Sequence, residues 1–500
     1  MNRVFFDVLI LLLVVGECQI CFSAPIVSTR GGSTKSAKQS SYSILARAIR
    51  NMFDDPPGLE KLEETLFALS SAQQTLKSLD GAAHEAYQRT HRNTGDVSGA
   101  TGRAKRSAAR AGSTADALLA AELCELLENQ DIFAQELVDA NNINGTLAGR
   151  EFVVHWTNLK LDRQSTLSCL VLHEPTYSGG VGLDHGGIDD LLNSGGSKNR
   201  GRLLIIVSDS VTTNLTQTLA ILNTEPLQIG LHAGLVANEI ASVQPTLYRA
   251  AGRLVKELEP WLEKYNSTDL AIHFVGRSLA GGVASLAATI LDGSLPLPLE
   301  KKKKSRARQS SDLLVVQDST EGKKSTELEG IGRGRSSAMV LGVPPCLSEN
   351  VKAAFVKSII YGDDVVCRTT QESLKRLLLR TKKGLKAGIL GRHLGLITDT
   401  MSLTVSSISR HAQGSEGEEE RLSVPGQSFL IRPRSLGSTC SMHEIGGQTG
   451  GREALRAAVL WQLNDILLSP SFWKHHGLES YIHGLDRVRL RGVDVDDKNS

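Results

Sequence analysis

The chain has 500 residues, enough for one large α/β domain with appendages or for two ordinary domains. Its 56 Lys and Arg nearly balance its 54 Asp and Glu, and aromatic residues are only 4% of the chain, which argues against a nucleic-acid-binding surface. One C-x-x-C pair, Cys18 and Cys21, lies at the end of an N-terminal apolar run, so a zinc framework or a dense disulfide scaffold is not expected.

The first 52 residues predict a targeting leader. Residues 1–21 contain one Arg, a short apolar run and then small residues, which is typical of a signal peptide and too short for a spanning helix. Residues 22–52 have no acidic residue and are rich in Ser, Thr, Arg and Lys, which is typical of a transit peptide or a disordered leader. Together the two segments resemble the bipartite plastid presequence of algae with complex plastids. The alternative is a plain secretory signal, which implies secretion or the endomembrane lumen.

Residues 53–140 predict a helical N-terminal extension. Leucines recur at helical spacing within 58–92, and residues 114–139 predict a second helix. The linker between them, 93–113, is rich in Gly, Ser and Arg. We expect this part to be an appendage and not a catalytic unit.

From residue 151 onward, short β-rich runs alternate with helical segments. Four of the runs are continuously apolar, as expected of strands that are buried on both faces of a parallel sheet. They are residues 202–210, 270–276, 337–343 and 356–362. This β-α-β-α order predicts an α/β fold with a mostly parallel, doubly wound central sheet.

Two segments interrupt that order. Residues 300–336 and 406–426 are charged and rich in Ser and Gly, which predicts two disordered surface insertions. The first insertion contains four consecutive lysines at 301–304. Four lysines barely reach the size of a lipid-binding cluster, so a solvated loop is favoured over a contact with anionic lipid.

The pentapeptide Gly276-Arg277-Ser278-Leu279-Ala280 approximates the G-x-S-x-G nucleophile elbow, with alanine in place of the second glycine. An apolar run precedes it and a small-residue helical pattern follows, so Ser278 is expected at a strand-to-helix turn. Such a turn lifts the serine Oγ out of the sheet and directs a helix N-terminus at developing negative charge. We therefore predict a nucleophile, and not merely a small polar residue at a turn. The backbone N–H of Leu279 is then one oxyanion donor.

The segment GRSLAGGVASLAA (276–288) resembles the nucleophile region of class 3 lipases, the fungal-lipase-like α/β-hydrolases. LGVPPCLSENV (341–351) and IIYGDDVVCR (359–368) are similar to segments of the sn-1-specific diacylglycerol lipase branch. ILLSPSFWKHHGLESYIHGL (466–485) resembles the closing motif of that branch, in which a His is followed five residues later by a Tyr. The resemblance implies an α/β-hydrolase domain, to which we assign residues 150–490.

The same resemblance implies a catalytic triad of Ser278, Asp364 and His476, in the chain order of α/β-hydrolases. Ser278 would attack the ester carbonyl, His476 would take and return the proton, and Asp364 would hold the imidazole tautomer and stabilise its charge.

Each partner of the serine has a rival. Asp363 lies beside Asp364, and Cys367 stands where the family has a proline. The five-residue spacing to Tyr481 selects His476 among the histidines near the C-terminus. The competing histidines are His443, His475 and His483.

A second oxyanion donor is harder to place. Class 3 lipases carry Arg-Gly-Thr at the end of the strand that here ends in Ser208-Asp209-Ser210. We predict that Ser210 supplies an N–H and a hydroxyl, although a carboxylate of Asp209 that pointed inward would oppose the oxyanion.

These residues predict a serine hydrolase, without cofactor or metal, that cleaves carboxylic esters of glycerolipids. Diacylglycerol, triacylglycerol, phospholipid and galactolipid stay open as substrates. We expect a peripheral and not a transmembrane protein that acts at a membrane or lipid-droplet surface and binds no nucleic acid. One alternative is a catalytically impaired lipase-fold protein that binds lipid or acts as a scaffold. Another is a regulatory protein built around the helical extension and the basic insertion.

Overall fold

The computed structural model describes parts of the chain from residue 40 onward. The described residues are 40–74, 114, 117–125, 127, 153–160, 166–177, 200–209, 214–231, 240–264, 271–298, 332–351, 353–387, 421–433, 440–445 and 465–496. The predicted signal peptide, the linker and the central parts of both insertions lie outside these residues, and their assignments stay predictions.

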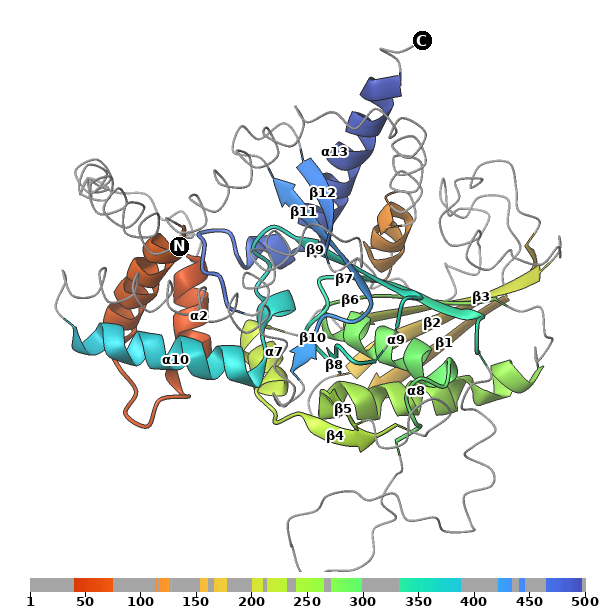
Figure 1. Ribbon diagram of the computed structural model, residues 1–500, viewed down its shortest axis with the longest axis horizontal. Helices are drawn as coiled ribbons and strands as arrows, with labels where there is room; N and C mark the ends of the chain where they lie inside the picture. Colours follow the sequence, from red (N-terminus) through yellow and green to blue (C-terminus); the bar gives the residue numbers. More distant parts are fainter. Residues whose placement is uncertain are drawn as a thin grey trace, which may run out of the picture. The chain divides into compact units, whose positions relative to one another are not determined.

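An eight-stranded sheet forms the centre of the fold (Figure 1). Its spatial order is β1 (Val153–Lys160), β2 (Thr166–Tyr177), β3 (Arg200–Asp209), β6 (Ala271–Arg277), β7 (Ser336–Leu341), β9 (Val356–Tyr361), β11 (Gln427–Pro433) and β12 (Cys440–Ile445). The five strands from β3 to β11 are parallel, whereas β1, β2 and β12 at the edges pair antiparallel. The predicted mostly parallel sheet is confirmed.

A second, four-stranded sheet is antiparallel. Its order is β10 (Leu422–Ser423), β8 (Leu347–Ser348), β5 (Ile240–Val243) and β4 (Leu227–Gly230). The N–H of Gln244, just after β5, donates to the carbonyl oxygen of Cys346 at 3.0 Å. This small sheet therefore ties the start of the following helix to the segment that leaves β7.

The described helices include one at residues 59–74 and those with the following bounds. They are α2 (Ser41–Arg50), α7 (Leu215–Leu222), α8 (Pro245–Lys264), α9 (Ser278–Leu291), α10 (Gln371–Lys386) and α13 (Leu478–Asp496), with short 3₁₀ helices η3 (Val366–Arg368) and η4 (Lys474–His476). Within the described part of the chain, no helix is both long and apolar enough to cross a membrane.

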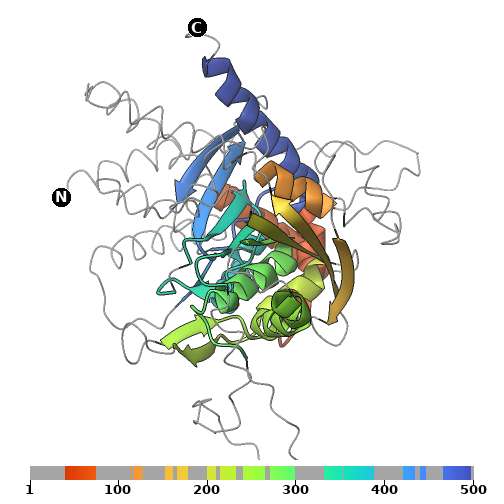
Figure 2. The same ribbon diagram turned by 90° about the vertical axis from the view of Figure 1, so that its right-hand side faces the viewer.

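Helices cover both faces of the central sheet (Figure 2). On β3, Leu203, Ile205 and Val207 belong to the hydrophobic core that includes α8 and α9. Leu204 and Ile206 belong to the second core, which includes α13. Because successive side chains of a strand point to opposite faces, a sheet covered on both sides needs continuously apolar strands. With a strand–serine–helix unit at its centre, the chain has the predicted α/β-hydrolase fold.

The N-terminal helices differ from the prediction. The leader was expected to reach residue 52, yet Leu45 and Ile49 of α2 are fully buried in the same core as α8 and α9. Leu62 and Leu66, on the helix of residues 59–74, are also fully buried there. The expected appendage thus shares, over residues 59–74, the core of the central sheet. The described part of this core includes helix α2, which the leader prediction had assigned to residues 22–52.

The composition of residues 22–52 hid helix α2. The segment is acid-free and Ser-rich, but Tyr42, Leu45, Ala46 and Ile49 recur at the spacing of one helix face and are buried. Ser40 caps the helix, since its side chain accepts a hydrogen bond from the N–H of Ser43 at 3.1 Å. The amphipathic pattern outweighs the leader-like composition because the apolar face finds a core to pack against.

Leu45→Ala tests whether α2 is integral to the fold. We expect the free energy of unfolding to fall by about 2–5 kcal/mol, because the substitution leaves a cavity in the shared core. Urea denaturation of the full chain measures this change. The exposed Arg47→Ala on the same helix is the control and should change the free energy by less than about 0.5 kcal/mol. Equal unfolding midpoints for Leu45→Ala and wild type would show that α2 does not share the core.

Candidate active site

Ser278 lies at a sharp turn between β6 and α9. Its φ of 57° is in the left-handed region, and it is the one non-glycine residue with positive φ among the described residues. A residue with a side chain is strained in this conformation, which persists only where the surrounding packing imposes it. The turn places the serine at the carboxyl end of β6, as a nucleophile elbow requires.

Two glycines let β6 and α9 approach closely at this turn. A Cβ atom added to Gly276 would lie 2.9 Å from Cα of Gly281, and one added to Gly281 would lie 3.0 Å from the carbonyl oxygen of Gly276. Ala280, which replaces the second glycine of the elbow pattern, is fully buried. The close approach thus falls on Gly281, so alanine at position 280 is compatible with the elbow.

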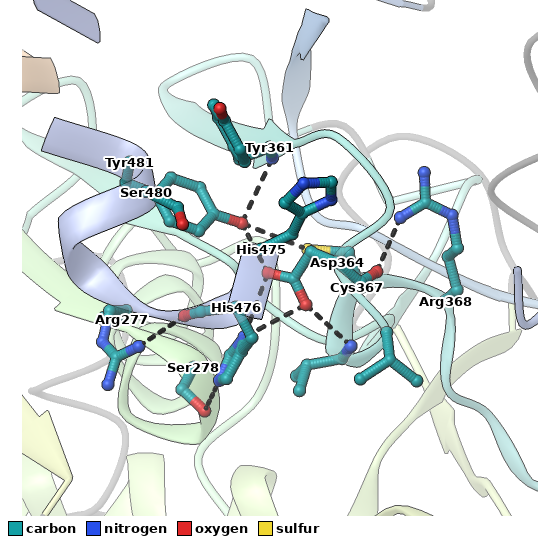
Figure 3. A network of polar contacts seen from close by, with 12 residues as sticks. Arg277, Ser278, Tyr361, Asp364, Cys367, Arg368, His475, His476, Ser480 and Tyr481 are labelled. Carbon is teal, nitrogen blue, oxygen red and sulfur yellow. Dashed lines mark hydrogen bonds and ion pairs between the residues drawn. The ribbon is translucent and has the colours of Figure 1, made fainter. Parts of the chain in front are cut away.

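Three side chains from distant parts of the sequence form a hydrogen-bonded row (Figure 3). Oγ of Ser278 lies 3.1 Å from Nε2 of His476. Nδ1 of His476 lies 3.1 and 3.0 Å from Oδ1 and Oδ2 of Asp364. All three side chains are buried. The structure therefore brings together the three residues selected from the sequence, in the arrangement of a Ser-His-Asp triad.

Asp364 follows β9 and is surrounded by groups that stabilise its charge. The hydroxyl of Tyr481 donates to Oδ2 at 2.5 Å, and the N–H of Val366 donates to Oδ1 at 2.8 Å. Complete burial opposes ionisation, but the charge of His476 and these hydrogen bonds outweigh it and hold the pKa of Asp364 below its usual value. Asp364 is therefore a carboxylate that can orient the imidazole.

Tyr481 reaches Asp364 from α13. Burial, followed by the charge of Asp364, raises the pKa of Tyr481 well above its usual value, so the phenol stays protonated and donates. The N–H of Tyr361 donates to the same hydroxyl oxygen at 3.2 Å. Sγ of Cys367 lies 3.9 Å from that oxygen. Burial, followed by the charge of Asp364, also raises the pKa of Cys367 well above its usual value, so Cys367 fills space as a neutral thiol.

The turn that carries Asp364 is fixed by a buried arginine. Arg368 is only 1% exposed, and its guanidinium donates to the carbonyl oxygens of Asp364 at 2.6 Å and Gly362 at 2.9 Å. These two bonds hold the backbone on both sides of Asp363. The carboxylate is thus supported through its backbone as well as through its oxygens.

The loop that carries His476 is held from two sides. Nη1 of Arg277 donates to the carbonyl oxygen of His476 at 2.7 Å, which connects the elbow to this loop. The Trp473 ring stacks on the imidazole, with centroids 5.3 Å apart and an interplanar angle of 28°.

Gly342, directly after β7, leaves room for the carboxylate of Asp364. Its φ is +60°, and a Cβ added there would lie 2.9 Å from Oδ2 of Asp364. A side chain at position 342 would therefore displace the carboxylate.

The competing residues lie elsewhere. Nδ1 of His475 accepts a hydrogen bond from the N–H of Asp363 at 3.0 Å, and its ring contacts that of Tyr361 (Figure 3). His483 is exposed on α13, and the side chain of His443 lies outside the described residues. Of the two adjacent histidines and the two adjacent aspartates, His476 and Asp364 therefore face each other.

The predicted oxyanion donors are placed only in part. Leu279 lies in the first turn of α9, where backbone N–H groups have no acceptor within the helix. Ser210 lies outside the described residues, but it directly follows β3. Val207 of β3 pairs with Gly276 of β6, so the end of β3 lies beside the strand that leads to Ser278. Ser210 as a donor stays a prediction.

Sequence reasoning missed several supporting roles. It noted Tyr481 only as a spacing marker and Arg277 only as a member of the elbow pentapeptide, and it assigned no role to Arg368 or Gly342. A glycine directly after a buried strand was the one available signal for Gly342, because such positions often need a positive φ. The contacts of Arg277 and Arg368 join segments whose proximity only the fold establishes.

No metal site accompanies the triad in the part of the chain that the structure describes. There, no group of three or more His, Cys, Asp or Glu side chains is placed to hold a metal ion. The absence of a cofactor stays a prediction.

Comparisons with known proteins give weak similarities to lipases. No protein-family model and no curated protein matches the chain. Among solved structures, it is similar to a triacylglycerol lipase from Penicillium expansum at 10% identity and a TM-score of 0.31, covering 73% of this chain and 98% of that chain. It is similar to M37 lipase at 10% identity and a TM-score of 0.34, covering 73% and 88%. A lipase from Rhizopus microsporus var. chinensis matches at 11% identity and a TM-score of 0.23, covering 43% and 55%. With similarities this low, the functional residues are assigned from the geometry of this chain.

Asp364→Asn tests the charge state of the carboxylate. Because the pKa of Asp364 is lowered by folding, its ionised form stabilises the folded protein above the usual pKa of about 3.9, and this stability is lost as the pH falls through the folded-state pKa. The variant cannot titrate at this position. We expect it to be less stable than wild type at about pH 6 and to approach wild type below about pH 4. Urea unfolding across this range measures the difference, and a difference independent of pH would contradict the lowered pKa.

Proposed function

We propose that this protein is a serine hydrolase that cleaves carboxylic esters. One observation carries the proposal: Oγ of Ser278, at a strained elbow, lies 3.1 Å from Nε2 of His476, whose Nδ1 lies 3.0 Å from the buried carboxylate of Asp364. A buried serine, imidazole and carboxylate in this order activate a hydroxyl that is otherwise a weak nucleophile.

The mechanism follows from this row. Ser278 attacks the ester carbonyl while its proton passes to Nε2 of His476, and Asp364 holds the Nδ1–H tautomer and stabilises the imidazolium. The N–H of Leu279 and the groups of Ser210 stabilise the oxyanion of the tetrahedral intermediate. His476 then protonates the departing alcohol, and the acyl group stays bound to Oγ of Ser278. Water activated by the same imidazole hydrolyses that acyl-enzyme and restores the serine.

We propose a glycerolipid at a membrane or lipid-droplet surface as the substrate. The support is the resemblance of the segments around Ser278, Asp364 and His476 to class 3 lipases, and of the latter two to the sn-1-specific diacylglycerol lipase branch. The proposed triad supports acyl transfer, the resemblance to lipases favours an ester as the substrate, and the lipid class depends on the acyl pocket. Diacylglycerol, triacylglycerol, phospholipid and galactolipid therefore stay open as substrates.

Ser278→Ala tests the proposed function. With a soluble p-nitrophenyl ester and with emulsified diacylglycerol, we expect kcat to fall by at least about a thousandfold, because the nucleophile is lost. Ser285→Ala is the matched control: this serine is also buried in α9, but its hydroxyl donates to the carbonyl oxygen of Gly282, away from His476. The full chain is used because residues 41–74 share the core.

Two outcomes would contradict an active triad. Equal hydrolysis by wild type and Ser278→Ala would show that another group does the chemistry. Folded wild-type protein that a fluorophosphonate probe does not label at Ser278 would favour the catalytically impaired lipid-binding or scaffold protein. The altered Ser208-Asp209-Ser210 segment is the feature that makes this second outcome worth testing.

Ser210→Ala tests the second oxyanion donor. If the hydroxyl donates to the oxyanion, kcat should fall by about a hundred- to a thousandfold with little change in KM, because the bond forms only in the transition state. Thr212→Ala, two residues further along the chain, is the control and should retain activity. Wild-type kcat in Ser210→Ala would assign the donor to a backbone N–H or to another residue.

A further inference from the structure

The segment that leads to His476 is held by the N-terminal helices. Residues 465–472, here named the approach segment, lie in neither a helix nor a sheet and end one residue before η4, which contains His476. Ile466, Leu468 and Phe472 are nonetheless almost completely buried. Because such a backbone has no ladder of its own, its polar groups need partners from elsewhere.

Side chains of residues 41–74 supply those partners. Three alternate carbonyl oxygens of the approach segment, those of Ile466, Leu468 and Pro470, each accept a hydrogen bond from this region. The bonds are Gln73 Nε2 to Ile466 at 2.9 Å, Ser70 Oγ to Leu468 at 2.8 Å, Gln74 Nε2 to Leu468 at 2.9 Å and Ser41 Oγ to Pro470 at 2.8 Å. The approach segment is thus paired along its length with helices that precede it by 393 to 429 residues.

Gln73 makes the central contact. Its amide donates to Ile466 O and also accepts from the N–H of Leu468 at 2.8 Å, so one side chain pairs with the backbone as a neighbouring strand would. Gln73 is fully buried. Loss of its amide would leave the buried carbonyl of Ile466 and the buried N–H of Leu468 without these partners, which is unfavourable in the protein interior.

The two ends of the approach segment are anchored separately. Arg380 of α10 pairs with Asp465 at 2.5 Å, and both side chains are buried. At the other end, the ring of Phe472 packs against that of Tyr42 on α2, with the ring centroids 6.3 Å apart. From there, one turn leads to His476. The position of the imidazole therefore depends on contacts with α2, α10 and the helix of residues 59–74.

We infer that the helix of residues 59–74 positions the proposed general base, with Gln73 as the positioning residue. Gln73 touches neither Ser278 nor His476 but holds the approach segment in the place that puts Nε2 of His476 at 3.1 Å from Oγ of Ser278. A displacement of about 1 Å at a reacting group can lower a rate by about a hundredfold. The inference rests on the proposed function, because it concerns the base of that reaction.

Gln73→Leu tests the inference in the full chain. It replaces the amide with an apolar side chain of similar size and removes both hydrogen bonds to the approach segment. We expect kcat to fall about ten- to a hundredfold at unchanged KM, and fluorophosphonate labelling of Ser278 to slow by the same factor. Amide hydrogen exchange should become faster in residues 465–476 and stay unchanged in β6 and β7.

Two further variants separate positioning from stability. Thr65→Val is the matched control. Thr65 is fully buried on the same helix, but its hydroxyl donates to the backbone carbonyl oxygen of Lys61 within that helix. The kcat and the amide exchange of residues 465–476 should therefore stay at wild-type values. Gln74→Met removes one bond to Leu468 O from a half-buried position and leaves the Ser70 bond. Gln74→Met should fold even if Gln73→Leu does not. Like Gln73→Leu it should lower kcat, but only severalfold.

The outcomes are distinguishable from failure of the proposed function. Suppose that wild type is labelled at Ser278 and that Gln73→Leu is labelled equally fast. The function then stands and the positioning role is overturned. Where Gln73→Leu does not fold, Gln74→Met takes its place in this comparison. Slower labelling without faster exchange in residues 465–476 would overturn the positioning role as well, because the segment would not have moved. An unlabelled wild type would overturn the function and this inference together.

Discussion

The contact between Nδ1 of His476 and the carboxylate of Asp364 is the interaction on which the rest of the site depends. A fully buried carboxylate is costly unless its charge is compensated. Here the imidazole, the Tyr481 hydroxyl and the Val366 N–H provide the compensation. The same contact that keeps Asp364 ionised also orients Nε2 toward Ser278, so the electrostatic requirement of the interior and the chemistry of the site are met together.

The parallel sheet brings the parts of this site to one edge. Ser278 follows β6, Gly342 follows β7 and Asp364 comes shortly after β9, and these strands are neighbours in the sheet. Because neighbouring parallel strands end on the same side, residues that follow them meet there. The histidine is different, since it arrives on a segment outside the sheet. Its placement therefore requires contacts that the sheet does not supply.

Those contacts come from the N-terminal helices, from α10 and from the elbow itself. Arg277 holds the backbone of His476 from the serine side, and the N-terminal helices hold the approach segment before it. Arg380 adds a buried ion pair at the start of that segment. Removal of either partner would leave a buried charge without its counter-charge, which is strongly unfavourable. The region expected to be an appendage thus bears on the geometry of the site.

The sequence by itself determined the parallel sheet, the elbow and the candidate triad. Continuous apolar runs specify strands buried on both faces, and small residues around Ser278 specify a close strand–helix approach; both are local patterns. The family resemblance favoured Asp364 over Asp363, and the spacing to Tyr481 favoured His476 over His475, but only the tertiary structure decided which of each adjacent pair faces the other. It also decided that residues 41–74 share the core and hold the approach segment. Local periodicity encodes which face of a helix is buried, whereas the partner of that face, hundreds of residues away, is set by the packing of the whole fold.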